Sequence, residues 1–427
     1  MGNFIYILFF SELLLIAISY TFSRGNLLSP SFVSYVMFAI STICVIYNVD
    51  LWDVHYSGIA YLFTMSGLIS MLLPELLILK IVGHKKTVVL QDAFINVKPY
   101  NIKTALLIIV ACLSIGMTVL YAYYVLNNGA SIGGVGLNAI GYLKHEGESN
   151  AISKISYRLS MILFYGYTYI VFFNVIKAKC KLKTQLLNMV PIVCFFIVTF
   201  FNGNRMGFLK CLSAFYVIAL AFTYQTSVFA KKDIRKIIKY VVLGGIILVV
   251  SFYLMRVITK VNTTTSDRSF IDYITYYIGS PVLLFSKYLD DPYSVHSINT
   301  LFGETTLTSL WQELGFNPVY ENKMLYVGGN SMFAGNAMTF FQQAHNDYGL
   351  FGMCLFTFIV YMFFDIAVYK WVLKRNKIGG IVTLMFFYYV VVTSFYYSQT
   401  MWAISLMNIL YIICILILIR YLRRIKI

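Results

Sequence analysis

Long hydrophobic runs separated by short polar connections form the pattern of this chain. Read as helices of about 20 residues, the runs give about 11 candidate membrane spans, with a range of about 10–12. The candidates lie near residues 3–22, 28–48, 57–82, 102–126, 156–176, 186–201, 206–224, 241–259, 350–370, 378–398 and 399–420. The pattern predicts an all-α polytopic membrane protein in which residues 1–427 form a single transmembrane domain.

The polar connections alternate between basic and non-basic along the chain. The basic ones lie at residues 21–26, 83–103, 177–183, 231–239, 370–377 and 420–427. The others lie at residues 50–57, 127–155, 202–205, 260–349 and 398–400. Because loops rich in Lys and Arg stay in the cytoplasm, the alternation predicts an N-terminus outside and a C-terminus in the cytoplasm. The odd number of spans agrees with these two ends.

Composition supports the membrane prediction and narrows the chemistry. The chain is 59% hydrophobic and 12% charged, against roughly 25% charged residues in soluble domains. Its net charge of +16 follows from the basic cytoplasmic loops, so the charge does not indicate a nucleic-acid partner. The seven cysteines form no C-x-x-C pair and the five histidines are scattered singly. We therefore expect no disulfide framework, no metal site and no cofactor.

The longest connection, residues 260–349, is predicted to be an outer loop with a function, because loops of this length are otherwise uncommon. It carries eight acidic and four basic residues. Residues 270–289 have the pattern of an amphipathic helix lying in the membrane interface. Residues 303–316 predict a second short helix, with Thr305 or Thr306 as its cap.

Polar side chains are concentrated in residues 335–352, where this loop meets the next span. If the stretch is one helix, His345 faces away from the other polar residues. The residues that share one side of that helix are Asn336, Thr339, Gln343 and Asp347, with Asn346 at its margin. Either the helix breaks before Gly349, or only one of His345 and Asp347 serves a common site. We interpret the stretch as the edge of an active site at a membrane surface.

His345 and Asp347 are the candidate general bases. A sugar hydroxyl is a poor nucleophile until a positioned side chain takes its proton, and an imidazole or a carboxylate can do this. Each residue also has a structural alternative. A single His in a loop is more often structural, and Asp is favoured as a helix cap before a span.

Arg205 is the candidate anion-binding residue. It follows a short turn at the predicted outer mouth of the span at 206–224. At mid-membrane an Arg costs about 2.5–3.5 kcal/mol, and at a helix N-terminus it opposes the helix dipole. A bound phosphate would resolve both problems, whereas interfacial snorkelling is the alternative. Further cations on the predicted outer face are candidates for binding a diphosphate: Arg256, Arg268, Arg158 and Lys154.

The order of two short motifs carries a resemblance to a known family. The first is Gly203-Asn204-Arg205 in the short outer turn, and the second follows the long loop. The residues of the second motif are Gly335-Asn336, Thr339, Asp347-Tyr348-Gly349 and Gly352. With the many spans, they resemble the oligosaccharide repeat-unit polymerases, the Wzy-type O-antigen polymerases of bacterial inner membranes. His345-Asn346 also resembles the His-Asn pair of O-antigen ligases, which share this architecture.

The resemblance implies a metal-independent glycosyltransferase of lipopolysaccharide biosynthesis, with its active site on the periplasmic side. The donor would be a growing glycan on undecaprenyl diphosphate, and the acceptor a hydroxyl of another lipid-linked repeat unit. Arg205 and the other cations would hold the leaving diphosphate, and Asp347 or His345 would take the proton. The remaining residues that would contact the diphosphate or glycan are Asn204, Asn336, Thr339, Gln343, Asn346 and Tyr348. A chain-length-determining co-polymerase is a further candidate partner.

Two alternatives to the polymerase remain open. An O-antigen ligase would move the glycan to lipid A core. A flippase or transporter of lipid-linked oligosaccharide would show charges near the midplane and repeat symmetry. The acids inside predicted spans are Glu12, Glu75 and Asp365, and we interpret them as inter-helix partners. A transporter leaves the long outer loop unexplained.

Overall fold

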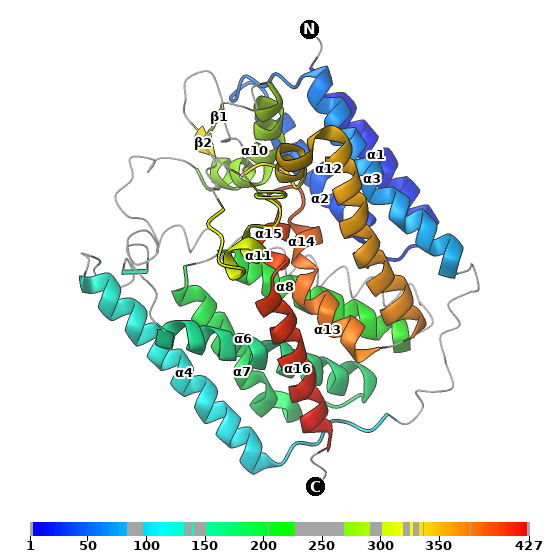
Figure 1. The fold of residues 1–427 in the computed structure, drawn as a ribbon. Helices are drawn as coiled ribbons and strands as arrows, with labels where there is room; N and C mark the ends of the chain where they lie inside the picture. The colour runs from blue at the N-terminus through cyan, green and yellow to red at the C-terminus, as the bar shows by residue number, and fades with distance from the viewer. Residues whose placement is uncertain are drawn as a thin grey trace. The chain divides into compact units, whose positions relative to one another are not determined.

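The computed structural model of the chain is predominantly helical (Figure 1). It describes residues 3–82, 97–131, 134, 139–140, 151–203, 205–226, 269–290, 301–318, 325–327, 333–335, 337–375 and 377–424. The chain forms two compact units. The first comprises residues 1–85, 268–375 and 387–409, and the second comprises residues 86–267, 376–386 and 410–427. We describe each unit by itself.

The first unit holds the N-terminal helices and the helices on either side of the long outer loop. Its elements are α1 (Ile5–Phe22), α2 (Pro30–Tyr47), α3 (Gly58–Val82), α10 (Phe270–Asp290), α11 (Thr308–Glu313), β1 (Leu325–Val327), β2 (Phe333–Gly335), α12 (Phe341–Asp365), the π-helix η6 (Ile366–Lys374), α14 (Tyr389–Val392), α15 (Thr400–Ala403) and the start of α16 (Leu406–Arg424). The strands β1 and β2 pair antiparallel, with Leu325 opposite Gly335. The sequence pattern did not predict this strand pair.

The second unit is built on α4, α6 and α7, which pack against one another. Its elements are α4 (Thr104–Ser131), α6 (Ala151–Phe172), the π-helix η3 (Phe173–Lys177), the 3-10 helix η4 (Leu182–Gln185), α7 (Leu186–Phe201), α8 (Arg205–Thr226), most of α13 (Ile378–Phe387) and the rest of α16. Phe164 packs on Phe195, with ring centroids 4.9 Å apart, and on Phe215, at 5.7 Å. An aromatic core therefore joins α6, α7 and α8.

The membrane-spanning character predicted from the hydrophobic runs is confirmed. Among the described residues, nine helices are long and apolar enough to cross a membrane, and each coincides with a predicted span. The predicted span at 241–259 lies outside the described residues. The one at 378–398 is shorter than predicted, because its apolar helical stretch ends at Val392. The total of eleven spans and the sidedness stay predictions.

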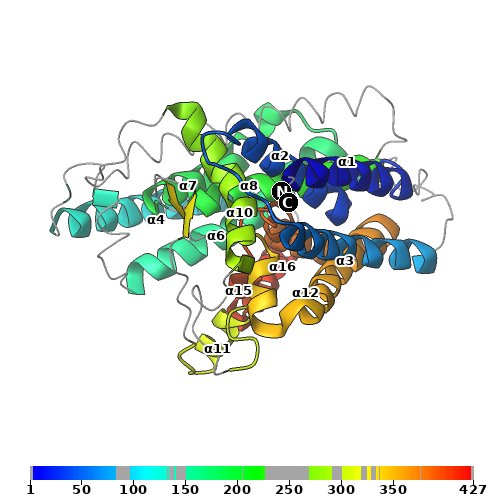
Figure 2. The ribbon, with the colours of Figure 1, turned by 90° about the horizontal axis from the view of Figure 1, so that it is seen from above.

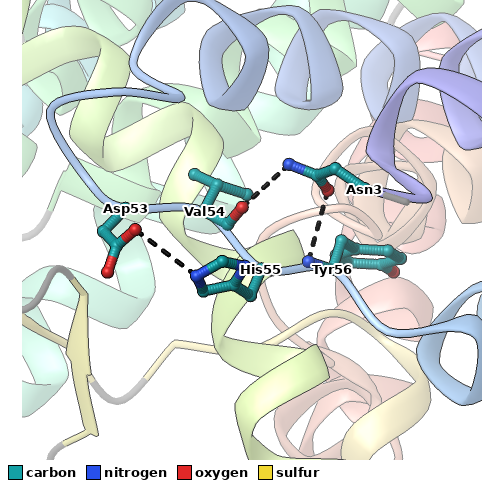
Figure 3. Close-up of polar contacts among 5 residues, drawn as sticks. All are labelled: Asn3, Asp53, Val54, His55 and Tyr56. Atoms are coloured by element: carbon teal, nitrogen blue, oxygen red, sulfur yellow. Dashed lines mark hydrogen bonds and ion pairs between the residues drawn. The ribbon is translucent and has the colours of Figure 1, made fainter. Parts of the chain in front are cut away.

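The N-terminus of α1 and the connection between α2 and α3 lie at the same end of the helices. The Asn3 side chain donates to the Val54 carbonyl, at 2.8 Å, and accepts from the Tyr56 amide, at 3.3 Å (Figure 3). The imidazole of His55 lies 3.4 Å from the Asp53 carboxylate, but both are exposed and the pair contributes little. If α1 and α2 cross the membrane one after the other, the start of α1 and the end of α2 lie on the same side. The contact therefore agrees with the predicted connectivity.

Helix α10 packs against α2, which changes the prediction of a helix lying in the membrane interface. The Ser41 hydroxyl donates to the Ile278 carbonyl at 2.6 Å. A Cβ added to Gly279 would lie 3.0 Å from Cys44 Cβ, so glycine permits this close approach. The six consecutive residues 281–286 are all buried, whereas an interfacial helix exposes one polar face. The predicted helix exists, but it is part of the helical core of this unit.

Helix α12 turns back on itself at Gly349. Gly349 has φ 67° and ψ −170°, a non-helical conformation within α12. The ring of Phe340 lies 6.1 Å from those of Phe356 and Tyr361. In a continuous helix, residues 340 and 361 would stand about 31 Å apart. Residues 341–348 therefore form a short helix that folds back beside the long part of α12.

The short helix runs in the opposite direction to α3, whereas the long part of α12 runs with it. Phe341 approaches Gly67 of α3, and His345 approaches Phe63, one turn closer to the start of α3. After the turn, Tyr369 of η6 reaches Glu75, near the far end of α3. Both views show α12 beside α3 (Figures 1 and 2). We name residues 341–348 the return helix, and residues 345–349 its tip.

Candidate active site

Asp347 at the tip of the return helix holds residues 305 and 306 through four hydrogen bonds. Its Oδ1 accepts from the Thr305 hydroxyl, at 2.7 Å, and from the Thr305 amide, at 3.2 Å. Its Oδ2 accepts from the Thr306 hydroxyl, at 2.7 Å, and from the Thr306 amide, at 2.8 Å. Both carboxylate oxygens therefore serve to fix the turn that leads into α11.

Asp347 lies in the return helix, before the break at Gly349 that precedes the span, so the structure does not test its predicted role as a cap of that span. The predicted cap of α11 is wrong: its N-cap is Leu307, with no side-chain hydrogen bond. Thr305 and Thr306 instead direct their hydroxyls to Asp347, since a charged acceptor forms the stronger hydrogen bond.

His345 contacts a different part of the unit. Its Nδ1 lies 3.0 Å from the Tyr288 hydroxyl at the end of α10. The edge of the His345 ring packs against Phe63 of α3, with ring centroids 5.3 Å apart. If Nδ1–H donates to the Tyr288 oxygen, Nε2 keeps a lone pair that can accept a proton. The side chain is half-buried, so the surrounding elements fix its orientation.

The structure decides between the two alternatives posed for His345 and Asp347. The helix is interrupted at Gly349, after both residues, so they share one short helix. On it they contact separate elements: α3 and α10 for His345, and the 305–306 turn for Asp347. They do not converge on one group. Asp347 holds the 305–306 turn and His345 contacts Tyr288, and which of the two is the base stays a prediction.

The other polar residues predicted around this site divide into a buried and a half-buried set. Thr339 precedes the return helix and is 1% exposed, so the predicted common face does not include it. The Gln343 side chain is buried and its Nε2 donates to Met401 Sδ at 3.0 Å. Asn346 is half-buried. The Tyr348 hydroxyl lies 2.8 Å from the Thr306 hydroxyl and extends the anchor.

Exposed aromatic rings lie beside this anchor. Phe302 is 76% exposed, and its ring lies 5.2 Å from that of Tyr348. The Trp311 indole N–H donates to the Phe302 carbonyl at 3.0 Å, and its ring contacts Phe316 edge-on. Flat apolar rings with polar neighbours suit the apolar faces and hydroxyls of sugars. The sequence reasoning missed this surface, although its aromatic residues stand close together between 302 and 316.

Glu313 fixes the other end of the same loop segment. Its carboxylate accepts from the Ser405 hydroxyl and the Leu406 amide, each at 2.6 Å, and from the Met407 amide at 3.3 Å. It therefore caps the first turn of α16 from outside the helix. Burial is the largest single influence and acts to raise the Glu313 pKa, but these hydrogen bonds outweigh it and the pKa is lowered. Residues 305–313 are thus anchored at both ends.

The predicted cations belong mainly to the second unit. Lys154 and Arg158 lie exposed on α6. Arg205 begins α8, as predicted for the mouth of that span. The side chain of Arg205 and the residues Asn204, Arg256, Arg268 and Asn336 lie outside what the structure describes. A cation cluster around a diphosphate stays a prediction.

Two of the three acids inside the spans of the first unit, Glu75 and Glu12, pair with hydroxyl groups, whereas both carboxylate oxygens of Asp365 are buried without a hydrogen-bond partner. Glu75 accepts from the Ser19 hydroxyl, at 2.9 Å, and from the Tyr369 hydroxyl, at 2.6 Å. Glu12 accepts from the Thr42 hydroxyl at 3.0 Å. Both contacts join different helices, in agreement with the predicted inter-helix role. Within the described residues, no group of three or more His, Cys, Asp or Glu side chains is arranged to hold a metal ion.

No family model, no curated protein and no solved structure matches this chain. The proposed function therefore depends on the residues of this chain alone.

Proposed function

We propose that the chain is an oligosaccharide repeat-unit polymerase. In this proposal it transfers a growing glycan from undecaprenyl diphosphate to a hydroxyl of another lipid-linked repeat unit, on the outer face of a bacterial inner membrane. The observation that carries the proposal is the tip of the return helix, where a held imidazole lies beside an anchored loop with exposed aromatic rings. The two sequence motifs and the multi-pass fold support the same assignment.

His345 takes the role of general base in this mechanism. The acceptor hydroxyl oxygen attacks the anomeric carbon of the donor sugar, and the bond from that carbon to the diphosphate oxygen breaks. The bonding electron pair leaves with the lipid diphosphate, and the hydroxyl proton moves to Nε2 of His345. The Tyr288 hydroxyl lies 3.0 Å from Nδ1 and positions the imidazole, and the mechanism requires the tautomer in which Nδ1–H donates to it. A positioned base of this kind contributes about 10²–10⁴-fold in rate.

Asp347 has a positioning role, because its oxygens already hold Thr305 and Thr306. The loop that it fixes presents Phe302 and Trp311 next to the tip of the return helix. In the proposed mechanism these rings bind the sugar faces, and the hydroxyl and amide groups around them bind the sugar hydroxyls. This assigns specificity to the 301–316 segment, and chemistry to His345.

The leaving diphosphate requires cations, for which Arg205 remains the candidate. A guanidinium beside the free amides of a helix start stabilises an oxyanion, and one well-placed donor contributes about 3–4 kcal/mol. We include Lys154, Arg158, Arg256 and Arg268 in this proposal as further diphosphate-binding residues. The energy for transfer is already present in the glycosyl–diphosphate bond, so the proposed reaction requires no metal ion and no nucleotide.

The test uses the full-length protein in membranes with purified lipid-linked repeat units, in the presence of a chelator. We expect His345→Ala to lower the polymerisation rate about 10²–10⁴-fold, and Tyr288→Phe to lower it about tenfold and to alter its pH profile. His55→Ala is the matched control, because His55 is an exposed imidazole of the same unit. Normal product ladders from His345→Ala would remove it from the mechanism, and normal ladders from Arg205→Ala would remove Arg205.

A deletion strain separates the polymerase from the ligase. Loss of a polymerase leaves a single repeat unit on the lipid A core, whereas loss of a ligase leaves naked core. Loss of activity on chelation would contradict the metal-independent chemistry. Accumulation of repeat units on the cytoplasmic face of the membrane would instead support a transporter.

A further inference from the structure

A cavity of about 330 Å³ lies between the end of α3 and the junction of α12 with η6. It belongs to the first unit and lies at the opposite end of α3 from the return helix. Its inner wall consists of Ile78, Met362 and Ile366, with Ile81 at its edge. This volume is at the lower end of the range of about 300–1,000 Å³ found for ligand pockets.

The lining residues from α12 and η6 change from apolar to cationic along one stripe. Met362, Ile366, Lys370 and Lys374 recur every four residues and all line the cavity. Residues four apart lie on one side of a helix, and these four share the cavity with Ile78 and Ile81 of α3. The cavity is therefore lined by four apolar side chains and three cationic ones, and most of the surface that they present to it is apolar.

Three cations gather at the outer end of the cavity. Lys370, Lys374 and Arg375 line it and are exposed, and none of the described residues that line it is acidic. Ile81, on the α3 side, is 75% exposed and continues the apolar wall onto the helix surface. An occupant that matches this surface carries a negative group on an apolar chain.

We propose that this cavity binds an anionic phospholipid of the surrounding membrane. The phosphate lies among Lys370, Lys374 and Arg375, and the first part of an acyl chain runs along Ile78, Ile366 and the exposed Ile81. The basic connections that follow α3 and η6 predict that this end faces the cytoplasm. Anionic lipids of the cytoplasmic leaflet bind such basic sites between spans. This inference does not depend on the proposed enzymatic activity.

The test measures lipid binding to the full chain in detergent by native mass spectrometry and by thermal unfolding. Phosphatidylglycerol and phosphatidylcholine with matched acyl chains are titrated separately, with inorganic phosphate as a third ligand. We expect phosphatidylglycerol to bind and to raise the unfolding midpoint. Phosphatidylcholine should bind at least about 100-fold more weakly, since each of the three cations contributes about fivefold near an anionic group.

The triple variant Lys370→Gln, Lys374→Gln, Arg375→Gln should weaken phosphatidylglycerol binding about 100-fold. The matched control neutralises three exposed lysines on another basic loop, as Lys179→Gln, Lys181→Gln, Lys183→Gln, and should retain binding. Equal affinity of the wild type for the two lipids would overturn the proposal without any variant. Unchanged binding by the triple variant would also overturn it. Stabilisation by inorganic phosphate alone, to the same extent, would show that the acyl chain has no part and would contradict the lipid assignment.

Discussion

Replacing Asp347 with Asn separates an anchoring role from a catalytic one. The carboxylate accepts four hydrogen bonds, two at each oxygen. An Asn side chain keeps one acceptor oxygen and loses the charge, so it retains two of the four bonds in neutral form. Hydrogen bonds to charged groups contribute about 1.5–3 kcal/mol each when fully buried. Because Asp347 is half-buried, we expect the variant to destabilise the docked loop by about 1–2 kcal/mol.

This destabilisation can be measured at the two threonine amides. A loss of about 1–2 kcal/mol corresponds to about 5–30-fold faster hydrogen exchange where the loop opens locally. We expect this acceleration at Thr305 and Thr306, with exchange in α3 unchanged. Removing only the hydroxyl donors, as in Thr305→Val with Thr306→Val, should cause a similar acceleration while leaving the carboxylate in place. Polymerisation should then fall in both variants, in parallel with the loss of loop protection.

The anchoring role of Asp347 is wrong if polymerisation activity and the exchange protection of the loop do not change together. If Asp347→Asn abolishes polymerisation while exchange at Thr305 and Thr306 stays at the wild-type rate, Asp347 acts on the substrate and is not an anchor. If the double threonine variant loses loop protection but keeps full activity, the docked loop has no part in catalysis. The first result would return Asp347 to the role of general base, and the second would leave its anchoring of the loop without a part in the reaction.

The remaining predictions concern Glu313 and Gly349. Near pH 7, Glu313→Gln should destabilise the first turn of α16 by about 0.5–1 kcal/mol and accelerate amide hydrogen exchange there accordingly. Because the Glu313 pKa is lowered in the folded protein, this stabilisation is fully present above the ordinary Glu pKa of 4.5 and is lost as the pH falls through the folded-state pKa. A difference in exchange between Glu313→Gln and the wild type that persists in acid would contradict the capping role. Gly349→Ala should destabilise the protein by about 1–3 kcal/mol through backbone strain alone, since an added Cβ meets nothing within 4 Å. The control Gly116→Ala, in a helix with equally open space, should be neutral or stabilising in thermal unfolding.

The spans could be predicted from the sequence because their signal is local. A helix of about 20 apolar residues is long enough to cross the membrane, and its side chains are compatible with lipid. Both properties can be read from the run itself, without any other segment of the chain. The span that the pattern misjudged, 378–398, is apolar throughout its first half, but its helix ends at Val392. Thr393 and Ser394 follow it: the Thr393 hydroxyl donates to the Tyr389 carbonyl of the same helix, and the Ser394 carbonyl accepts from the Phe340 amide, which is distant in sequence.

The site could be predicted only in part because its partners are distant in sequence. Asp347 was identified from its place before a span, but Thr305 and Thr306 lie 42 and 41 residues away. His345 and Tyr288 are 57 residues apart. The turn at Gly349 also depends on packing that no local pattern records, since Phe340 has to stack against Phe356. Local periodicity therefore left open whether the helix breaks before Gly349 or continues through it.

Some buried polar groups of the first unit serve the backbone where helices are interrupted. The start of the return helix lies beside the residues that follow α14. The Phe340 amide donates to the Ser394 carbonyl there, at 2.7 Å. The Val391 carbonyl accepts from the Ser34 hydroxyl at 3.2 Å. Backbone groups released by a broken helix within a membrane need partners from the protein, because lipid offers none. Buried hydroxyls such as that of Ser34 supply them, so polar character alone does not mark a catalytic residue in this unit. At the tip of the return helix, by contrast, His345 is half-buried and the neighbouring Phe302 is exposed, which is what the proposed sugar site requires.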